Sequence, residues 1–166
     1  MSSTVIEAST RRFAAEPEAA LSAPAVTATL ANGRARLSAG SFNWDSDLPP
    51  AVGGANLAPS PTAYLLGALA GCAVAFVHDT LAPQLGLRID GVSAVASCRA
   101  DARGLLGMDG AVPDLDDVAV EIRVDSPEPA DRLQRLFQVW QERCPIYLAL
   151  VEPVTVRATF TIGGAA

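Results

Sequence analysis

Residues 61–77 have the sequence PTAYLLGALAGCAVAFV, and the part from Ala63 to Val77 is apolar throughout. A proline at position 61 suits the first turn of a helix, because the N–H that it lacks would have no intrahelical partner there. About 15 apolar residues are too few to span a bilayer, which takes roughly 18 to 20. The run therefore predicts a helix that is buried on nearly all sides and ends near residues 79–83.

Such a helix is too apolar to be covered by one face of a small sheet, so we expect a second copy of the chain to cover the rest. Gly67 and Gly71 lie four residues apart. They either allow another backbone to approach closely or are merely tolerated in the helix. One stripe of the helix carries Leu65, Leu69, Cys72 and Phe76.

The segments on both sides of this helix alternate apolar and polar residues, as half-buried strands do. Asn32-Gly33 separates two such runs and predicts a β-hairpin, with Arg34 and Arg36 on one face of the returning strand. Further strands are expected at 41–44, 91–103, 118–124 and 154–162, with Val118, Val120, Ile122 and Val124 facing inward in the third.

A second long helix is predicted after Ser126-Pro127-Glu128-Pro129. Its apolar positions follow the spacing i, i+3, i+4, i+7, and they are Leu133, Leu136, Phe137 and Trp140. Cys144 continues this stripe, but Pro145 cannot occupy a helix interior. Cys144 is therefore expected at a helix break, as the cap of a shorter helix over 145–151.

These elements predict an α+β fold in which a mostly antiparallel sheet wraps the buried central helix. A chain of 166 residues fits one domain, which we place at 24–166. Residues 1–23 are rich in Ala, Ser and Glu, and Pro17 and Pro24 interrupt any helix there. They are expected to form an accessory, loosely held segment.

The composition excludes several kinds of function. A net charge of −6 leaves no basic surface for nucleic acid or an anionic membrane. All 12 basic residues are arginine, so neither a Schiff-base lysine nor a P-loop lysine is available. Three widely spaced cysteines and the lack of a signal-like apolar segment favour free thiols in the reducing cytosol.

The cysteines are the candidate reactive groups. Cys72 and Cys144 lie on the inward stripes of their helices, and they are either small buried hydrophobes or a redox pair. The helix start at Pro145 favours Cys144 as the thiolate, whereas Cys72 would need an arginine from elsewhere. Cys98 is expected in the core, and His78 is expected at the surface near the helix end. No two of these four residues lie within four positions of each other, so no metal site is expected.

Two motifs resemble the OsmC/Ohr family of thiol-dependent peroxidases. The first is residues 59–72, PSPTAYLLGALAGC, preceded by Gly53-Gly54 in a proline-rich loop. The second is residues 142–147, ERCPIY, which is similar to the Cys-Pro resolving motif of that family. The separation of the cysteines and the order of elements agree over roughly residues 25 to 162.

The resemblance implies a homodimer with two sites at the subunit interface and no cofactor. Cys72 would attack an organic hydroperoxide and become a sulfenic acid, and Cys144 would condense with it to a disulfide. A dithiol, in the best-understood branch a lipoylated protein, would reduce that disulfide. An arginine of the N-terminal strands, Arg34 with Arg36 as second choice, would stabilise the thiolate.

One position departs from the peroxidase branch, because Thr62 stands where that branch has a glutamate that pairs with the arginine. Asp45 or Asp47 would have to hold the arginine instead. The chain therefore resembles a divergent OsmC-type member, with hydroperoxide reductase as the leading function. The alternative is a binding or redox-sensing module of the same fold, with an apolar interface pocket and little turnover.

Overall fold

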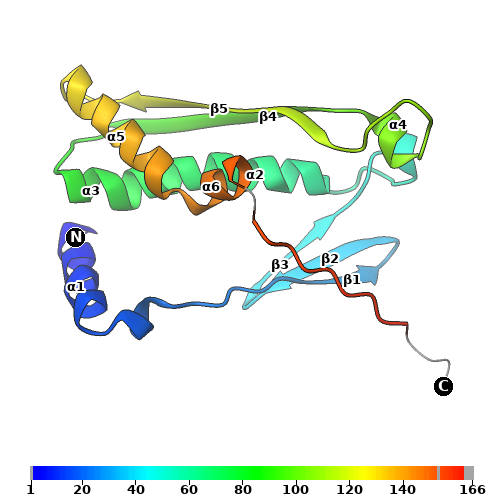
Figure 1. The fold of residues 1–166 in the computed structure, drawn as a ribbon, viewed down its shortest axis with the longest axis horizontal. Helices are drawn as coiled ribbons and strands as arrows, with labels where there is room; N and C mark the ends of the chain where they lie inside the picture. Colours follow the sequence, from blue (N-terminus) through cyan, green and yellow to red (C-terminus); the bar gives the residue numbers. More distant parts are fainter. Residues whose placement is uncertain (1, 153, 163–166) are drawn as a thin grey trace.

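Figure 1 shows a long central helix with a two-stranded sheet on one side and a separate three-stranded sheet beyond its other side. The computed structural model describes residues 2–152 and 154–162. The α-helices are α1 (Ser2–Ala15), α2 (Pro61–Ala75), α3 (Ala82–Leu85), α4 (Ala102–Leu105), α5 (Ala130–Arg143) and α6 (Pro145–Val151). The strands are β1 (Thr27–Ala31), β2 (Arg34–Ala39), β3 (Phe42–Ser46), β4 (Gly91–Ala100) and β5 (Leu115–Asp125). Short 3-10 helices η1 (Pro17–Ala20) and η2 (Pro50–Val52) and a π-helical segment η3 (Phe76–Leu81) complete the order.

The central helix begins as predicted, but it ends later. The Ser60 hydroxyl accepts a hydrogen bond from the Ala63 N–H and caps α2. The helix then continues through η3 into α3, so that Pro61–Leu85 forms 25 helical residues. Pro83 does not end it, because the wider π turn just before Pro83 relieves the clash between the proline ring and the preceding turn.

The expectation that this helix is too short for a bilayer is therefore wrong. By length and composition alone, Pro61–Leu85 could cross a membrane. The core helix of a soluble protein meets the same criteria of length and composition.

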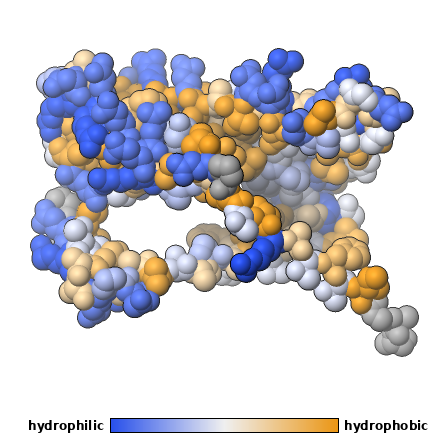
Figure 2. Space-filling model, viewed as in Figure 1, coloured by the Kyte–Doolittle hydropathy of each residue, from blue (hydrophilic) through white to orange (hydrophobic). Residues whose placement is uncertain are grey.

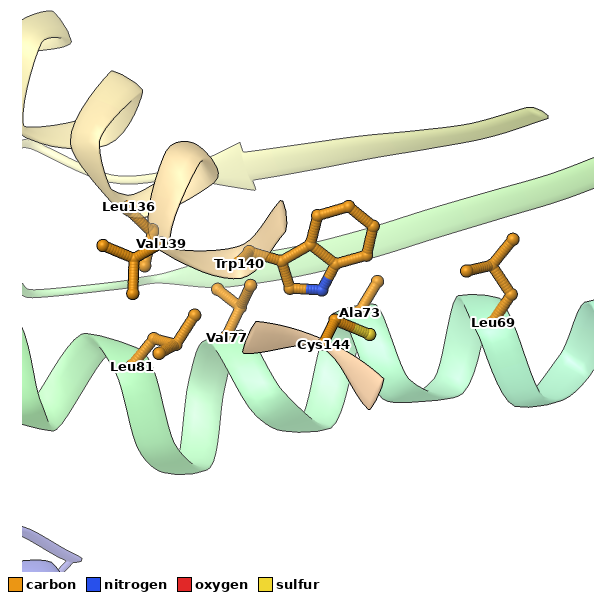
Figure 3. Packing of buried hydrophobic residues seen from close by; sticks show 8 residues of the cluster. All are labelled: Leu69, Ala73, Val77, Leu81, Leu136, Val139, Trp140 and Cys144. Atoms are coloured by element: carbon orange, nitrogen blue, oxygen red, sulfur yellow. The ribbon is translucent and has the colours of Figure 1, made fainter. Parts of the chain in front are cut away.

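Within one chain the helix is buried along a single stripe rather than on nearly all sides. Leu69, Ala73, Val77 and Leu81 pack against Leu136, Val139, Trp140 and Cys144 (Figure 3). Leu65, which was expected on the buried stripe, is 37% exposed. A Cβ atom placed on Gly67 or Gly71 would meet no atom within 4 Å. No other part of this chain therefore packs closely against either glycine.

Both sheets are antiparallel, as predicted. The Asn32-Gly33 turn joins β1 to β2, and both of its residues have positive φ, at 52° and 77°. On β4 the partly buried and exposed residues alternate, whereas on β5 Val118 is 39% exposed although it was expected to face inward. The register shifts between Ser97 and Arg99, and this bulge changes the alternation at that end of β5.

The C-terminal segment does not form the predicted strand. Residues 154–162 belong to neither sheet in the described structure, and in Figure 1 they run away from α6 without joining a ladder. Val156 and Phe160 are 82% and 91% exposed. The alternating pattern is that of a strand, but these residues pair with no sheet edge in the described structure.

The N-terminal segment contains a helix that the sequence did not predict. This 14-residue helix, α1, contacts α3 and η3, while most side chains of residues 4–15 are exposed. The helix ends before Pro17, so that proline limits the helix without preventing it. The sequence did not predict this helix because its alanines, which favour a helix, lie among short polar residues, which favour caps and turns.

The buried stripe predicts a stability effect for Leu81, which is fully buried where η3 meets α5. We expect Leu81→Ala to lower the free energy of unfolding by about 2–5 kcal/mol, because it leaves a cavity in the core. Leu21→Ala, at a 73% exposed side chain, is the matched control and should change it by no more than about 0.5 kcal/mol. Denaturant unfolding measures both. Equal effects of the two substitutions would show that η3 is not part of the core.

Candidate functional site

Two cysteines from different helices meet beneath the two-stranded sheet. The Sγ atoms of Cys72 on α2 and Cys144 at the end of α5 lie 3.1 Å apart, and both are free thiols. Cys144 is fully buried, whereas Cys72 is half-buried. A disulfide bond has an S–S length of about 2.05 Å, so a shift of roughly 1 Å would join them. The structure thus places a pair that can be oxidised without refolding.

The helix break holds Cys144 in this position. Its backbone is extended, with φ −71° and ψ 111°, as the residue before a proline requires. The Cys144 N–H donates to the Trp140 carbonyl at 2.8 Å, and the Cys144 carbonyl accepts from the Leu148 N–H at 2.9 Å. Both backbone groups of Cys144 are therefore tied to helices, α5 on one side and α6 on the other.

The environment of Cys72 favours the protonated thiol. Burial, followed by the hydrogen bond with Cys144 and the charge of Cys144, raises the pKa of Cys72 to about 11. The Ile146 backbone N–H, which donates toward Cys72, acts in the opposite direction. The reactive form of a cysteine is the thiolate, so in this chain alone Cys72 is a weak nucleophile at neutral pH.

Arg34 is held by Asp45, which is one of the two partners that the sequence offered. Arg34 Nε lies 3.1 Å from Asp45 Oδ2, and Arg36 Nε lies 2.5 Å from Asp45 Oδ1. Asp47 instead accepts hydrogen bonds from backbone N–H groups of the proline-rich loop. These bonds, led by that from Leu57, lower the pKa of Asp47 and fix the loop before α2.

The structure does not bring Arg34 to Cys72. The Tyr64 hydroxyl donates to the Asp45 carbonyl at 2.6 Å and ties β3 to the first turns of α2. Cys72 lies eight residues further along, about 12 Å at 1.5 Å per residue. No arginine within the described residues contributes to the pKa of Cys72. Of the three predicted site residues, Cys72 and Cys144 therefore meet within one chain, and Arg34 does not join them.

The other singled-out residues lie apart from this pair. Thr62 is half-buried on the first turn of α2 and lines an apolar cavity of about 540 Å³. Cys98 lies half-buried on the inward face of β4. His78 is exposed as expected and pairs with Asp79 at 2.7 Å, but it lies within the long helix rather than at its end. Among the residues described, no three His, Cys, Asp or Glu side chains form a metal-binding group.

Sequence reasoning missed the role of Trp140 in shaping the site. Its ring lies 5.0 Å from that of Tyr147 and 5.8 Å from that of Phe137. Phe137, expected in the core, is 46% exposed and lines an apolar cavity of about 620 Å³ together with Trp140. The only signal was an aromatic residue one helical turn before Cys144, which is equally typical of a plain core position.

Comparison with known proteins supplies a family. Residues 53–159 match the family model described as OsmC-like protein. This span contains both Cys72 and Cys144 and excludes β1 and β2 with Arg34. No curated protein sequence matches the chain at a significant level.

Solved structures share the fold. An OsmC-like protein from Mycoplasma pneumoniae superimposes with a TM-score of 0.66 at 19% identity, over 80% of this chain and 89% of its own. An organic hydroperoxide resistance protein from Legionella pneumophila gives 0.62 at 18% identity, over 80% and 92%. The organic hydroperoxide resistance protein OhrB of Bacillus subtilis gives 0.53 at 20% identity, over 81% and 94%. At such identities the likeness concerns the fold alone.

The 3.1 Å separation predicts selective oxidation of the pair. Diamide should convert Cys72 and Cys144 to a disulfide and leave Cys98 as the one free thiol, because only the first two sulfurs are in contact. Thiol counting and peptide mapping by mass spectrometry measure this. Cys98→Ser is the control and should form the same disulfide. A bridge that includes Cys98 would contradict the geometry.

Proposed function

Because this chain belongs to the OsmC-like protein family, we propose that it is a thiol-dependent peroxidase that reduces organic hydroperoxides with Cys72 and Cys144. The observation that carries the proposal is the 3.1 Å contact between the two sulfurs, which suits an attacking and a resolving thiol. Two proteins of similar fold bear the name organic hydroperoxide resistance protein, which supports the same substrate class.

The proposed cycle needs no cofactor. The Cys72 thiolate attacks the terminal peroxide oxygen, the O–O bond breaks, and the alkoxide leaves as an alcohol after taking up a proton. Cys72 is then a sulfenic acid. The Cys144 thiol attacks its sulfur, and the hydroxyl group leaves as water with the thiol proton. A dithiol, for example the lipoyl group of a lipoylated protein, reduces the resulting disulfide and becomes a disulfide itself.

The cycle requires a positive charge beside Cys72, and we propose that Arg34 of a second copy supplies it. One face of α2 is uncovered, and the C-terminal strand-like segment is unpaired within the described chain. Figure 2 shows an opening between the layer that contains α2 and the chain that leads from α1 to β1. A homodimer would fill this space, pair the segment and bring the Asp45-held arginines of one copy to the other.

The apolar surroundings support an organic peroxide over hydrogen peroxide. The cavity of about 620 Å³ is lined by Ile122, Leu133 and Phe137, among others, and reaches Trp140, which packs in the same cluster as Cys144. An alkyl tail gains free energy by leaving water for such a surface. Since the proposed cycle depends on free thiols, we place the protein in the reducing cytosol.

A binding or redox-sensing module is the second candidate. The raised pKa of Cys72 favours it, and so does Thr62 in place of the glutamate of the peroxidase branch. If no arginine reaches Cys72, the pair would respond slowly to oxidants and would not turn over.

Variants of the two cysteines separate the two candidates. Cys72→Ser should abolish consumption of cumene hydroperoxide, because Cys144, the other thiol of the proposed site, is fully buried and out of reach of the peroxide. Cys144→Ser should consume one equivalent and leave a sulfenic acid on Cys72, which dimedone trapping and intact mass detect. Cys98→Ser is the control and should retain turnover with a dithiol. Equal and negligible consumption by wild type and Cys72→Ser would favour the binding module.

The proposed role of Arg34 predicts a pH shift. In a chain that retains Cys72 alone, the rate of alkylation by iodoacetamide should rise with pH and level off above the thiol pKa. An arginine nearby lowers that pKa, so the midpoint should move to higher pH in Arg34→Ala.

Arg123→Ala is the matched control, since Arg123 forms only an exposed ion pair with Asp125. It should leave the midpoint unchanged. Mixing Cys72→Ser chains with Arg34→Ala chains tests the second copy, because a mixed dimer would hold one intact site and regain activity. Identical midpoints for the parent chain, Arg34→Ala and Arg123→Ala would show that Arg34 does not act on Cys72.

A further inference from the structure

The indole N–H of Trp140 is buried without a hydrogen-bond partner. Trp140 is 1% exposed, and its Nε1 is the one buried side-chain nitrogen or oxygen in the described residues that lacks a partner. Leaving such a donor unsatisfied costs free energy, so native structures rarely do so without a reason. The position therefore calls for an acceptor that is present in only part of a functional cycle.

The orientation of the ring indicates where that acceptor lies. Trp140 and Cys144 are one helical turn apart on α5 and belong to the same buried cluster. Figure 3 shows the indole nitrogen on the ring edge that faces α2, on the side where the Cys144 side chain lies. In the reduced pair the indole N–H and Cys144 Sγ form no hydrogen bond. A neutral thiol is a weak acceptor, whereas a thiolate accepts strongly and would draw the two groups together.

We propose that the Trp140 indole N–H donates a hydrogen bond to Cys144 Sγ when that sulfur carries negative charge as the leaving group in disulfide reduction. The inference rests on the proposed Cys72–Cys144 disulfide. It assigns a function to a tryptophan that would otherwise be only a core side chain.

The burial of the two sulfurs sets the direction of reduction. A dithiol from solvent reaches the half-buried Cys72 and not the fully buried Cys144. Its thiolate forms a bond to Cys72 Sγ, the Cys72–Cys144 bond breaks, and Cys144 leaves with the electron pair. The second thiol of the reductant then attacks the mixed disulfide and releases Cys72. A proton finally returns to each protein thiolate.

Cys144 needs a donor at the moment it leaves. Cys72 has the Ile146 backbone N–H close by, and Cys144 is surrounded by apolar side chains such as Leu136 and Ala73. A charge in such surroundings is costly unless it accepts a hydrogen bond. Trp140 Nε1 supplies one from the element that carries Cys144 itself. By microscopic reversibility, the same bond assists Cys144 in the reverse step, when its thiolate attacks Cys72 in the mixed disulfide.

The test removes the N–H and keeps the shape of the side chain. Benzothienylalanine replaces the indole nitrogen with sulfur, and it is incorporated at position 140. The disulfide is formed with diamide, and its reduction by dithiothreitol is followed by rapid mixing. Loss of a hydrogen bond to a charged sulfur should slow reduction by about 10- to 100-fold. Alkylation of Cys72 by iodoacetamide in the reduced protein should stay unchanged, because Cys144 is not charged in that step.

Two further variants complete the test. Trp140→Phe should slow reduction to the same degree with some loss of stability, and it serves if the analogue does not fold. Benzothienylalanine at Trp44, which packs on Tyr64 away from the cysteines, is the matched control and should leave reduction unaffected. Unchanged reduction rates in both Trp140 variants would overturn the inference.

The diamide route keeps this inference separate from the peroxidase proposal. If the Trp140 variants slow disulfide reduction while wild-type Cys72 does not react with hydroperoxide, the role of Trp140 as hydrogen-bond donor is supported and the peroxidase proposal is refuted. A mixed disulfide of glutathione found on Cys144 instead of Cys72 would overturn the assigned direction of attack, and with it the role of Trp140.

Discussion

The packing of the C-terminal half of α5 against one stripe of α2 determines where the chemistry can occur. Leu136, Val139 and Trp140 cover that stripe, and α5 ends just beyond them, at Arg143. Pro145 then forces Cys144 out of the helical conformation at the point where Cys72 faces it. The sulfur pair is thus a product of core packing, and disturbing that contact would separate the two thiols.

The same packing brings no arginine of the described chain close enough to affect the pKa of Cys72. Burial and the neighbouring Cys144 thiol keep Cys72 protonated, while the cationic residues Arg34 and Arg36 gather around Asp45 on another sheet. Apolar surface on α2 and in the C-terminal segment also remains exposed in one chain. One event, the docking of a second copy, would remedy the electrostatic and the hydrophobic deficit together.

Local sequence signals predicted the elements whose geometry is decided within a few residues. Asn32-Gly33 specified a hairpin, and Cys144-Pro145 specified a helix break. Predictions failed where distant contacts decide. Pro83 lies inside a helix because the π turn before it accommodates the proline ring, and residues 154–162 carry a strand pattern but pair with no sheet edge in the described structure. The cysteine pair could be expected from its stripes, but the position of Arg34 relative to Cys72 depends on how the sheets assemble.

The π-helical segment η3 sets the angular phase of everything beyond it. Leu69, Ala73, Val77 and Leu81 recur every four residues, a spacing that overshoots an α-helical turn of 3.6 residues and would drift around an ordinary helix. The wider turn at Phe76–Leu81 corrects that drift and keeps Leu81 beneath α5. Loss of one residue there would rotate α3, and the α1 helix docked on it, by about 100° relative to Cys72. The extra residue in the π turn therefore keeps each end of the helix in the orientation that its own packing partners require.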